Sequence, residues 1–477
     1  AAGIIASITI GGLLGFSSRV TPDPASEPSG LPAASRYPGP GQTATLAPLP
    51  SDVPTVYHVA KGGADSAAGS EADPWRTIQH AVDVAPQGSA ILVHDGMFKP
   101  FAITRSGLTV AGAPGETAVI AGTTGTQYVI HIEGASNVTI RDLTVRGADV
   151  TFGSGIRVDG GSRVSVVRTT LRDNRSFGIK VKDSTDSLIV GNDIFKNETG
   201  IELSGKVDGA TITDNAIHEN DRMVTPTRGG NAVVFATTTG PIAVTGNRLW
   251  GNRARHLHDK GYDGGAFEVY ASSDLTISDN VVWDNNNVME TGTDGSAPCD
   301  RIVFTRNVVY GAGKVPHQTE GMILRCASHS TVAQNTFDGL DTYAFYVATK
   351  RDFAGSIVGL RIENNIVVRG RTYSLTRGIP RSVVIDHNLS RPGGTRADYG
   401  NYLAYVEGRG NTDLLGEFRA WTGYDRHGLV ADPRFADQRA RDYHLRAGSP
   451  AIDRGAVVVR DGYDGRAPDL GRYEVLR

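Results

Sequence analysis

The chain has 477 residues, with 48 Lys and Arg against 51 Asp and Glu, which gives a formal net charge of −3. This balance lacks the basic excess typical of nucleic-acid-binding proteins and excludes nucleic acid as an expected partner. Aromatic residues make up only 7% of the chain while Gly occurs 59 times, a composition that favours thin strands and turns over a thick aromatic core.

The first residues are apolar and are followed by a polar linker. Ala1 to Phe16 carry no charge, so we interpret residues 1–19 as a signal-peptide core or an anchor, with a buried helix as the alternative. Residues 20–54 are rich in Pro, Ser, Ala and Gly and have too few large apolar residues to fold. We therefore expect a secreted or cell-surface protein with a possible membrane tether.

The folded region is predicted to begin near Val56. Residues 75–85 carry apolar side chains at helical spacing and end in Pro86-Gln87-Gly88. A short amphipathic helix at this position would cover the exposed first turn of a stacked fold. Strands are expected next at residues 90–93 and 108–110.

A short phrase of alternating apolar residues followed by Asn then repeats along the chain. The repeated asparagines are separated by 23, 32, 33, 27, 28, 30 and 23 residues, a range typical of a solenoid. We expect each to sit at a bend in the left-handed conformation and to hydrogen-bond to the Asn of the next rung. They are Asn192, Asn215, Asn247, Asn280, Asn307, Asn335, Asn365 and Asn388.

A second alternating phrase lies between the asparagines, for example Gly178-Ile179-Lys180-Val181 and Gly200-Ile201-Glu202-Leu203. Two or three short strands per repeat describe one rung of a parallel β-helix. Residues 55–390 are predicted to form this solenoid. The repeat fails after Ser390, so residues 391–477 are expected to form the C-terminal rungs and an irregular cap.

The two cysteines fall at similar places in neighbouring repeats. Cys299 lies eight residues before Asn307, and Cys326 lies nine before Asn335. Rungs about 4.8 Å apart bring such positions within disulfide reach. We predict a Cys299–Cys326 disulfide, as suits an exported protein, and two unpaired buried thiols are the alternative.

Two segments carry a family resemblance. The N-terminal edge reads YHVAKGG and PWRTIQHAVD, and the tail reads DYHLRAGSPAIDRG. These segments resemble secreted bacterial right-handed parallel β-helix proteins of the pectate-lyase-like superfamily. The resemblance implies an all-β right-handed parallel β-helix with a short N-terminal capping helix. The superfamily includes polysaccharide lyases, glycoside hydrolases, uronate epimerases and non-catalytic adhesins, so the fold alone does not assign a reaction.

Stacking the second phrase predicts an outward column of side chains that contains two neighbouring glutamates, Glu268 and Glu290. Their separation of 22 residues is one rung, and two carboxylates this close repel unless a proton, a cation or a function compensates. A glycoside hydrolase would use such a pair, Ca²⁺ would bind it, and solvated surface glutamates are the third reading. The column is Arg157, Lys180, Glu202, Val234, Glu268, Glu290 and Ile323.

Long insertions around residues 222–230, 253–264, 292–298 and 311–320 flank this column and are expected to build one binding face. The second insertion supplies His256, His258 and Lys260, which are candidate bases for removing a proton beside a uronate carboxylate. Further groups are expected to bind substrate through charge, hydrogen bonds or stacking. These are Lys180, Glu202, Arg325, His317, Tyr262 and Trp283.

Residues 283–287, Trp-Asp-Asn-Asn-Asn, resemble the acidic rung of Ca²⁺-dependent pectate lyases, although they carry fewer aspartates than those enzymes do. Asp263, Asp284 and Asp294 are the candidate ligands for a possible Ca²⁺, and no organic cofactor is expected.

The sequence thus predicts an extracellular enzyme that degrades a polysaccharide, with a lyase acting on a uronate-containing glycan by β-elimination placed first. A glycoside hydrolase that uses Glu268 and Glu290 is the alternative. A non-catalytic glycan-binding surface protein is the second alternative.

Overall fold

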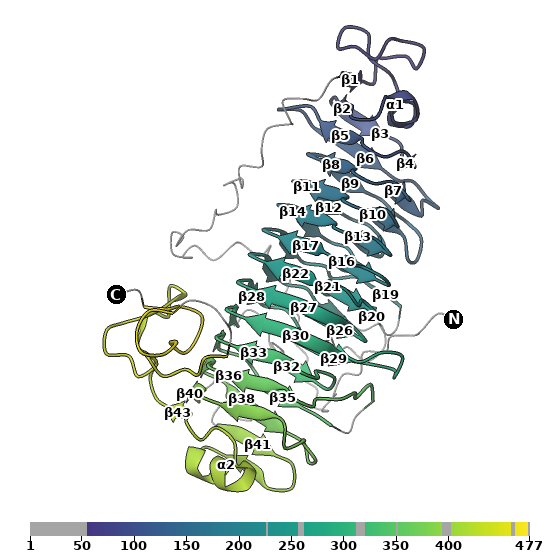
Figure 1. The fold of residues 1–477 in the computed structure, drawn as a ribbon. Helices are drawn as coiled ribbons and strands as arrows, with labels where there is room; N and C mark the ends of the chain where they lie inside the picture. The colour runs from purple at the N-terminus through teal and green to yellow at the C-terminus, as the bar shows by residue number, and fades with distance from the viewer. Residues whose placement is uncertain are drawn as a thin grey trace, which may run out of the picture.

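The computed structural model describes residues 55–225, 228–255, 262–311, 320–349, 352–393, 402–458 and 463–475. Three sheets of 13 strands each run side by side along one elongated body, and successive rungs pair in parallel (Figure 1). The predicted all-β right-handed parallel β-helix is confirmed. The predicted apolar segment 1–19 and linker 20–54 lie outside the described residues.

Each rung passes through the three sheets in a fixed order, which we name A, B and C, as in β27, β28 and β29. Sheet A contains β1 (Val56–Val59), β2 (Ala90–Val93), β5 (Thr109–Gly112), β8 (Thr139–Arg141), β11 (Ser165–Val167), β14 (Leu188–Val190), β17 (Ala210–Thr213), β22 (Ile242–Thr245), β27 (Ser273–Ser278), β30 (Asp300–Thr305), β33 (Thr331–Ala333), β36 (Arg361–Glu363) and β39 (Val384–Asp386).

Sheet B follows sheet A after a tight turn. It contains β3 (Gly96–Phe98), β6 (Ala118–Ala121), β9 (Thr144–Arg146), β12 (Thr170–Arg172), β15 (Asp193–Phe195), β18 (Ala216–His218), β23 (Arg248–Trp250), β28 (Val281–Trp283), β31 (Val308–Tyr310), β34 (Thr336–Asp338), β37 (Ile366–Val368), β40 (Leu389–Arg391) and β43 (Leu429–Val430).

Sheet C completes the rung and ends in an antiparallel pair, β41 with β42. It contains β4 (Phe101–Ile103), β7 (Tyr128–Glu133), β10 (Ser154–Asp159), β13 (Phe177–Lys182), β16 (Thr199–Ser204), β21 (Asn231–Ala236), β26 (Gly265–Tyr270), β29 (Asn287–Gly292), β32 (Glu320–Leu324), β35 (Tyr343–Val347), β38 (Arg371–Leu375), β41 (Ala404–Val406) and β42 (Gly410–Thr412).

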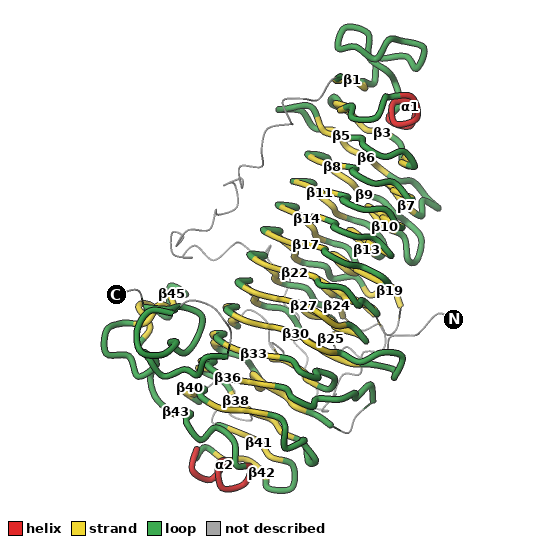
Figure 2. Tube along the Cα trace, viewed as in Figure 1, coloured by secondary structure: helices red, strands yellow, loops and turns green. Residues whose placement is uncertain are grey.

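The remaining elements are short. Two antiparallel hairpins project between sheets B and C, and a third lies in the C-terminal region. They are β19 (Met223–Thr225) with β20 (Arg228–Gly229), β24 (Ala254–Arg255) with β25 (Tyr262–Asp263), and β44 (Phe435–Asp437) with β45 (Asp442–Leu445). The helices are α1 (Ile78–Val84) and α2 (Leu415–Thr422), one at each end of the solenoid (Figure 2). No helix of the described residues is long and apolar enough to cross a membrane.

The repeated asparagines form the predicted ladder at the turn from sheet A to sheet B. Each is at most 2% exposed, and each side-chain amide donates to the next Asn Oδ1 at 2.9–3.1 Å. Asn388 ends the series, and its backbone N–H donates to Asp425 Oδ1. Buried amides that are paired in this way avoid the free-energy cost of an unmet hydrogen bond.

The left-handed conformation was predicted at the ladder asparagines themselves, and this prediction is wrong by one residue. The left-handed residue is the one before each Asn, for example Asp279 with φ 60° or His387 with φ 54°. The turn is made there, and this leaves the Asn side chain free to point into the stack. A second ladder at the turn from sheet B to sheet C was not predicted; it consists of Asn174, Asn197, Asn220, Asn252 and Asn285.

Both ends of the solenoid are covered. At the N-terminal end α1 buries Ile78, Ala81 and Val82, and Thr77 accepts a hydrogen bond from the His80 backbone N–H, so the predicted capping helix is present. Near the other end the C-terminal lobe packs on the outer side of sheet B, where Tyr443 and Leu470 belong to one buried cluster with Trp283 and Tyr310.

The predicted disulfide is confirmed. Cys299 and Cys326 lie on neighbouring rungs with Cα atoms 5.2 Å apart, and both residues are fully buried. The bond closes a segment with a sequence separation of 27 residues. It therefore restricts the unfolded chain and ties two rungs together.

We predict that a Cys299→Ser, Cys326→Ser double variant lowers the free energy of unfolding by about 3.5 kcal/mol, the value expected for a loop of this length. Urea unfolding followed by fluorescence measures the change. Reductant should lower the wild-type midpoint to that of the variant and leave the variant unchanged. An equal midpoint for the oxidised wild type and the variant would contradict a stabilising role.

Glu474 in the C-terminal lobe predicts a pH dependence. Burial, together with the nearby Asp469, Asp453 and Asp464 carboxylates, raises its pKa to about 7, while the Asp469 backbone N–H donates to Glu474 Oε1 at 2.9 Å. A carboxyl group with a raised folded-state pKa favours folding at low pH, and this contribution is lost as the pH rises from about 4.5 toward 7.

We therefore expect Glu474→Gln to raise the urea midpoint at pH 8 and to leave it nearly unchanged at pH 4, where the wild-type group is protonated. The exposed residue Asp413 offers a control, because Asp413→Asn removes a charge from the surface. A Glu474→Gln effect that is the same at both pH values would refute the titration.

Candidate functional site

The outward column predicted on sheet C is present in the predicted order. Direct register pairs join its members from rung to rung, and Glu268 pairs with Glu290. Strands in this register lie about 4.8 Å apart. The members are Arg157, Lys180, Glu202, Val234, Glu268, Glu290 and Ile323.

The middle of this column is buried, although its side chains point away from the solenoid core. Glu202 is 2% and Val234 is 1% exposed, whereas Glu268 and Glu290 are half-buried. Outward side chains on an open sheet would be solvated, so other parts of the chain cover this stretch. The two glutamates therefore lie where a covered part of the face meets solvent.

The insertions stand along both edges of sheet C. Hairpins β19–β20 and β24–β25 both lie at the turn from sheet B to sheet C, whereas residues 312–319 of the predicted insertion lie outside the described residues. The segment 292–298 lies at the opposite edge, where sheet C turns into sheet A, and Phe353 from a later rung contacts Tyr270 there with ring centroids 6.2 Å apart. The face that carries Glu268 and Glu290 thus has insertions on both sides.

The two glutamates have different partners. The Asn231 side-chain amide donates to Glu268 Oε2 at 2.7 Å, and the Arg325 guanidinium forms an ion pair with Glu290 Oε1. An arginine beside a carboxylate favours its charged form. The described contacts of the pair thus include a guanidinium on Glu290 and an amide donor on Glu268.

Arg325 is held in place by its surroundings. Its side chain is 7% exposed, and it donates from Nε to the Thr291 carbonyl at 3.4 Å and from Nη1 to the Asp352 carbonyl at 3.3 Å. The next residue is Cys326, whose backbone N–H donates to Thr291 Oγ1 at 3.1 Å. The disulfide therefore anchors the chain directly beside this guanidinium.

Tyr270 and Asp294 border the same face. Burial, followed by the neighbouring Asp294 and Glu268 carboxylates, raises the pKa of Tyr270 to about 12. Its hydroxyl therefore stays protonated at neutral pH and is a hydrogen-bond donor. Hydrogen bonds from Ser296 lower the pKa of the exposed Asp294 carboxyl.

Lys180 and Glu202, two predicted substrate-binding residues, bind each other instead of standing apart. Lys180 Nζ lies 2.6 Å from Glu202 Oε1 and 4.5 Å from the Phe177 ring centroid. At about 4.8 Å per rung they lie roughly 10–15 Å along the face from Glu268. They lie on the same outward face of sheet C as the glutamate pair.

One predicted sugar-binding residue lies on another side of the solenoid. Trp283 ends β28 of sheet B, is 3% exposed, and stacks between Trp250 and Tyr310 with centroids 4.8 and 5.6 Å away. Its stacked neighbours and the C-terminal lobe cover it, so its predicted role in substrate binding is wrong.

The predicted Ca²⁺ ligands are not gathered at one point. Asp263 is buried and accepts from the Gly264 N–H at 2.8 Å, Asp284 occupies a turn with φ 52°, and Asp294 lies beside Tyr270. In the part of the chain that the structure describes, these three carboxylates do not form a group that could surround one ion.

Other predicted residues have a simpler outcome. Tyr262 lies half-buried in hairpin β24–β25 at the edge of sheet C. The candidate bases His256, His258 and Lys260 and the candidate ligand-binding residue His317 lie outside the described residues, so their roles stay predictions.

Asn231, which contacts Glu268, was not predicted from the sequence. The signal available for it was its place at the start of β21, three residues before the column residue Val234.

The comparisons with known proteins agree with this architecture. Residues 119–282 and 154–315 match the family model for the right-handed β-helix region. An uncharacterized protein of Bacillus subtilis, YwoF, is 24% identical over 447 residues, which are 83% of this chain and 91% of that protein.

A solved structure with a TM-score above 0.5 shows the same fold. The complex of XylC with xylose has a TM-score of 0.55 at 12% identity and covers 80% of this chain and 87% of that one. The pectate lyase Pel9A has a TM-score of 0.46 at 16% identity, covering 88% and 96%. This chain therefore has the fold of a right-handed parallel β-helix.

Proposed function

We propose that this protein cleaves a polysaccharide by hydrolysis on the outward face of sheet C, with Glu268 and Glu290 as the reacting carboxyl groups. The observation that carries the proposal is their direct register on neighbouring rungs, together with the Arg325 guanidinium on Glu290. Hydrolysis with retention uses two carboxyl groups about 5 Å apart, close to the spacing of one rung.

The ion pair between Arg325 and Glu290 is the basis for the roles that we propose. Glu290, whose charge the Arg325 guanidinium stabilises, is the nucleophile that attacks the anomeric carbon as the glycosidic bond breaks. Glu268 protonates the departing glycosidic oxygen, while Asn231 holds its other oxygen at 2.7 Å. Glu268 then removes a proton from the water that releases the sugar from Glu290, which restores both groups.

A glycan ligand fits the surroundings of the pair. Insertions along both edges of sheet C leave a lengthwise face over several rungs, the shape needed for an extended chain. XylC, which shares the fold, was solved with xylose. Export of this protein, inferred from its N-terminal segment and its disulfide, would place the site where extracellular polysaccharides are met.

β-Elimination on a uronate-containing glycan is the second candidate. It is favoured by Arg325 next to the column, since a guanidinium can neutralise a uronate carboxylate, and by the His256, His258 and Lys260 segment that precedes Glu268. A Ca²⁺ bound near Asp294 would be part of this alternative.

We expect Glu290→Gln and Glu268→Gln each to lower turnover at least 100-fold, the lower end of the effect of a lost acid, base or nucleophile, with little change in the urea midpoint. A polysaccharide panel is assayed for new reducing ends, with Glu133→Gln at the end of β7 in the same sheet as the matched control. Unchanged turnover in Glu290→Gln would remove the pair from the site.

The product distinguishes the mechanisms. Hydrolysis gives reducing ends without an ultraviolet-absorbing unsaturated uronate, and the released sugar initially keeps the anomeric configuration, which proton NMR reports. An unsaturated product that requires Ca²⁺ would replace hydrolysis by β-elimination. Glycan binding without either product would reduce the function to binding.

A further inference from the structure

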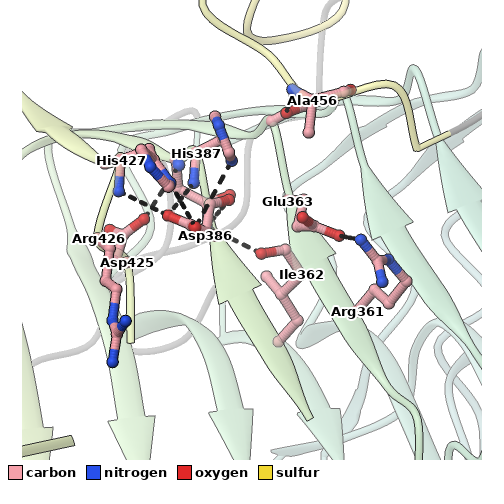
Figure 3. A network of polar contacts seen from close by, with 12 residues as sticks. Arg361, Ile362, Glu363, Asp386, His387, Asp425, Arg426, His427 and Ala456 are labelled. Atoms are coloured by element: carbon pink, nitrogen blue, oxygen red, sulfur yellow. Dashed lines mark hydrogen bonds and ion pairs between the residues drawn. The ribbon is translucent and has the colours of Figure 1, made fainter. Parts of the chain in front are cut away.

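Three metal-ligating side chains meet at the C-terminal end of the solenoid, away from the outward face of sheet C (Figure 3). Asp386 ends β39 of sheet A, His387 makes the next turn with φ 54°, and His427 belongs to the segment that follows α2. Their ligand atoms all lie within 4.8 Å of one another, and no other such group occurs in the described ranges.

The Asp386 carboxylate is fixed in orientation. Its Oδ1 accepts from the backbone N–H groups of His387 at 2.9 Å and of His427 at 2.7 Å. Its Oδ2 then faces both imidazoles, with His427 Nδ1 at 2.8 Å and His387 Nδ1 at 3.7 Å. Backbone donors that hold a carboxylate in this way are typical partners of a metal-ligating carboxylate.

The ring nitrogen of His387 supplies an independent observation. His387 Nδ1 is buried and has no hydrogen-bond partner, although it points toward Asp386. The two imidazoles are stacked, with centroids 4.6 Å apart and an interplanar angle of 20°. Leaving a buried polar atom unpaired destabilises a protein. A cation between the three groups would give this nitrogen a partner.

Two other groups of histidines in the described residues are arranged differently. His329 Nδ1 lies 2.8 Å from Asp300 Oδ1 without a second imidazole on that carboxylate. His94 contacts both His58 and Glu116. Its Nε2 lies 3.0 Å from His58 Nδ1, and its Nδ1 lies 3.0 Å from Glu116 Oε1. Those contacts are hydrogen bonds between paired groups, whereas His387 directs an unpaired nitrogen at a carboxylate that already holds another imidazole.

We propose that Asp386 Oδ2, His387 Nδ1 and His427 Nδ1 bind a divalent transition metal of the zinc class, with water as the fourth ligand. Imidazole nitrogens select Zn²⁺, Cu²⁺ or Ni²⁺ over Ca²⁺. Metal–ligand distances near 2.0–2.1 Å in a tetrahedral site place ligand atoms about 3.3 Å apart. The separations of 2.8 and 3.7 Å from Asp386 Oδ2 lie on either side of that value, and one of the two stacked rings turns on binding so that both Nδ1 atoms face the ion.

The proposed metal joins two parts of the chain that close the solenoid. The segment around His427 already bonds to the last full rung, since Asp425 N donates to the Ile385 carbonyl at 2.7 Å and Leu429 N donates to the Asn388 carbonyl at 2.8 Å. A metal bound to Asp386, His387 and His427 would lock this segment onto the rung. Its role is therefore structural and independent of glycan cleavage.

Isothermal titration of the chelator-stripped full chain with ZnSO₄ tests the site. We expect one equivalent of Zn²⁺ to bind and to raise the thermal midpoint. His387→Gln and His427→Gln should each lower the affinity more than the roughly tenfold to hundredfold typical of losing an outer-shell partner. His329→Gln, which removes a histidine from a similar His–Asp pair, should leave both the affinity and the shift unchanged.

Co²⁺ provides a second readout, because a tetrahedral site with two imidazoles gives intense visible absorption bands that both histidine variants should lose. Asp386→Asn, which keeps the backbone-accepting oxygen, serves if a histidine variant fails to fold in the metal-free state. The proposal is overturned if Zn²⁺ does not bind, or if it binds the wild type and the folded variants equally. Glycan turnover enters none of these readouts.

Discussion

The amide-to-amide hydrogen bond between successive asparagines is the interaction on which the solenoid depends. It recurs from Asn192 to Asn388, buried at every rung, and it holds the turn from sheet A to sheet B at the same place in each. Repeats of 23 to 33 residues can stack only if the extra residues leave the rung elsewhere. The insertions therefore emerge at the edges of sheet C, on either side of the outward face that carries Glu268 and Glu290.

The same ladder explains why much of the site could be predicted. Because each Asn marks one fixed point in a rung, counting from it aligns side chains that lie far apart in the sequence. That alignment placed Glu268 on Glu290 and Cys299 near Cys326, as the register and the disulfide confirm. Arg325 was predicted as a binding residue, and its ion pair with Glu290 places it beside the predicted carboxylates.

What was missed depends on contacts that local periodicity does not encode. Trp283 has the residue type of a sugar platform, but its β28 strand belongs to sheet B, and the C-terminal lobe returns over that sheet from more than a hundred residues later. Asp386 and His427 meet because the segment after α2 folds back on the last rung. Asn231 contacts Glu268 from the neighbouring rung, and the insertion between the two residues lengthens their separation in the sequence.

The outward column also shows why the glutamate pair stands apart from its neighbours. Stacked side chains on a solenoid repeat every 4.8 Å or so, and like charges at that spacing destabilise the stack. Lys180 satisfies this constraint through its ion pair with Glu202, the next residue of the column. Glu268 and Glu290 instead lie between Val234 and Ile323, and the donors that contact them, Asn231 and Arg325, come from outside the column. A local rule that is broken at one place and compensated by separately positioned groups is the pattern expected of a functional site.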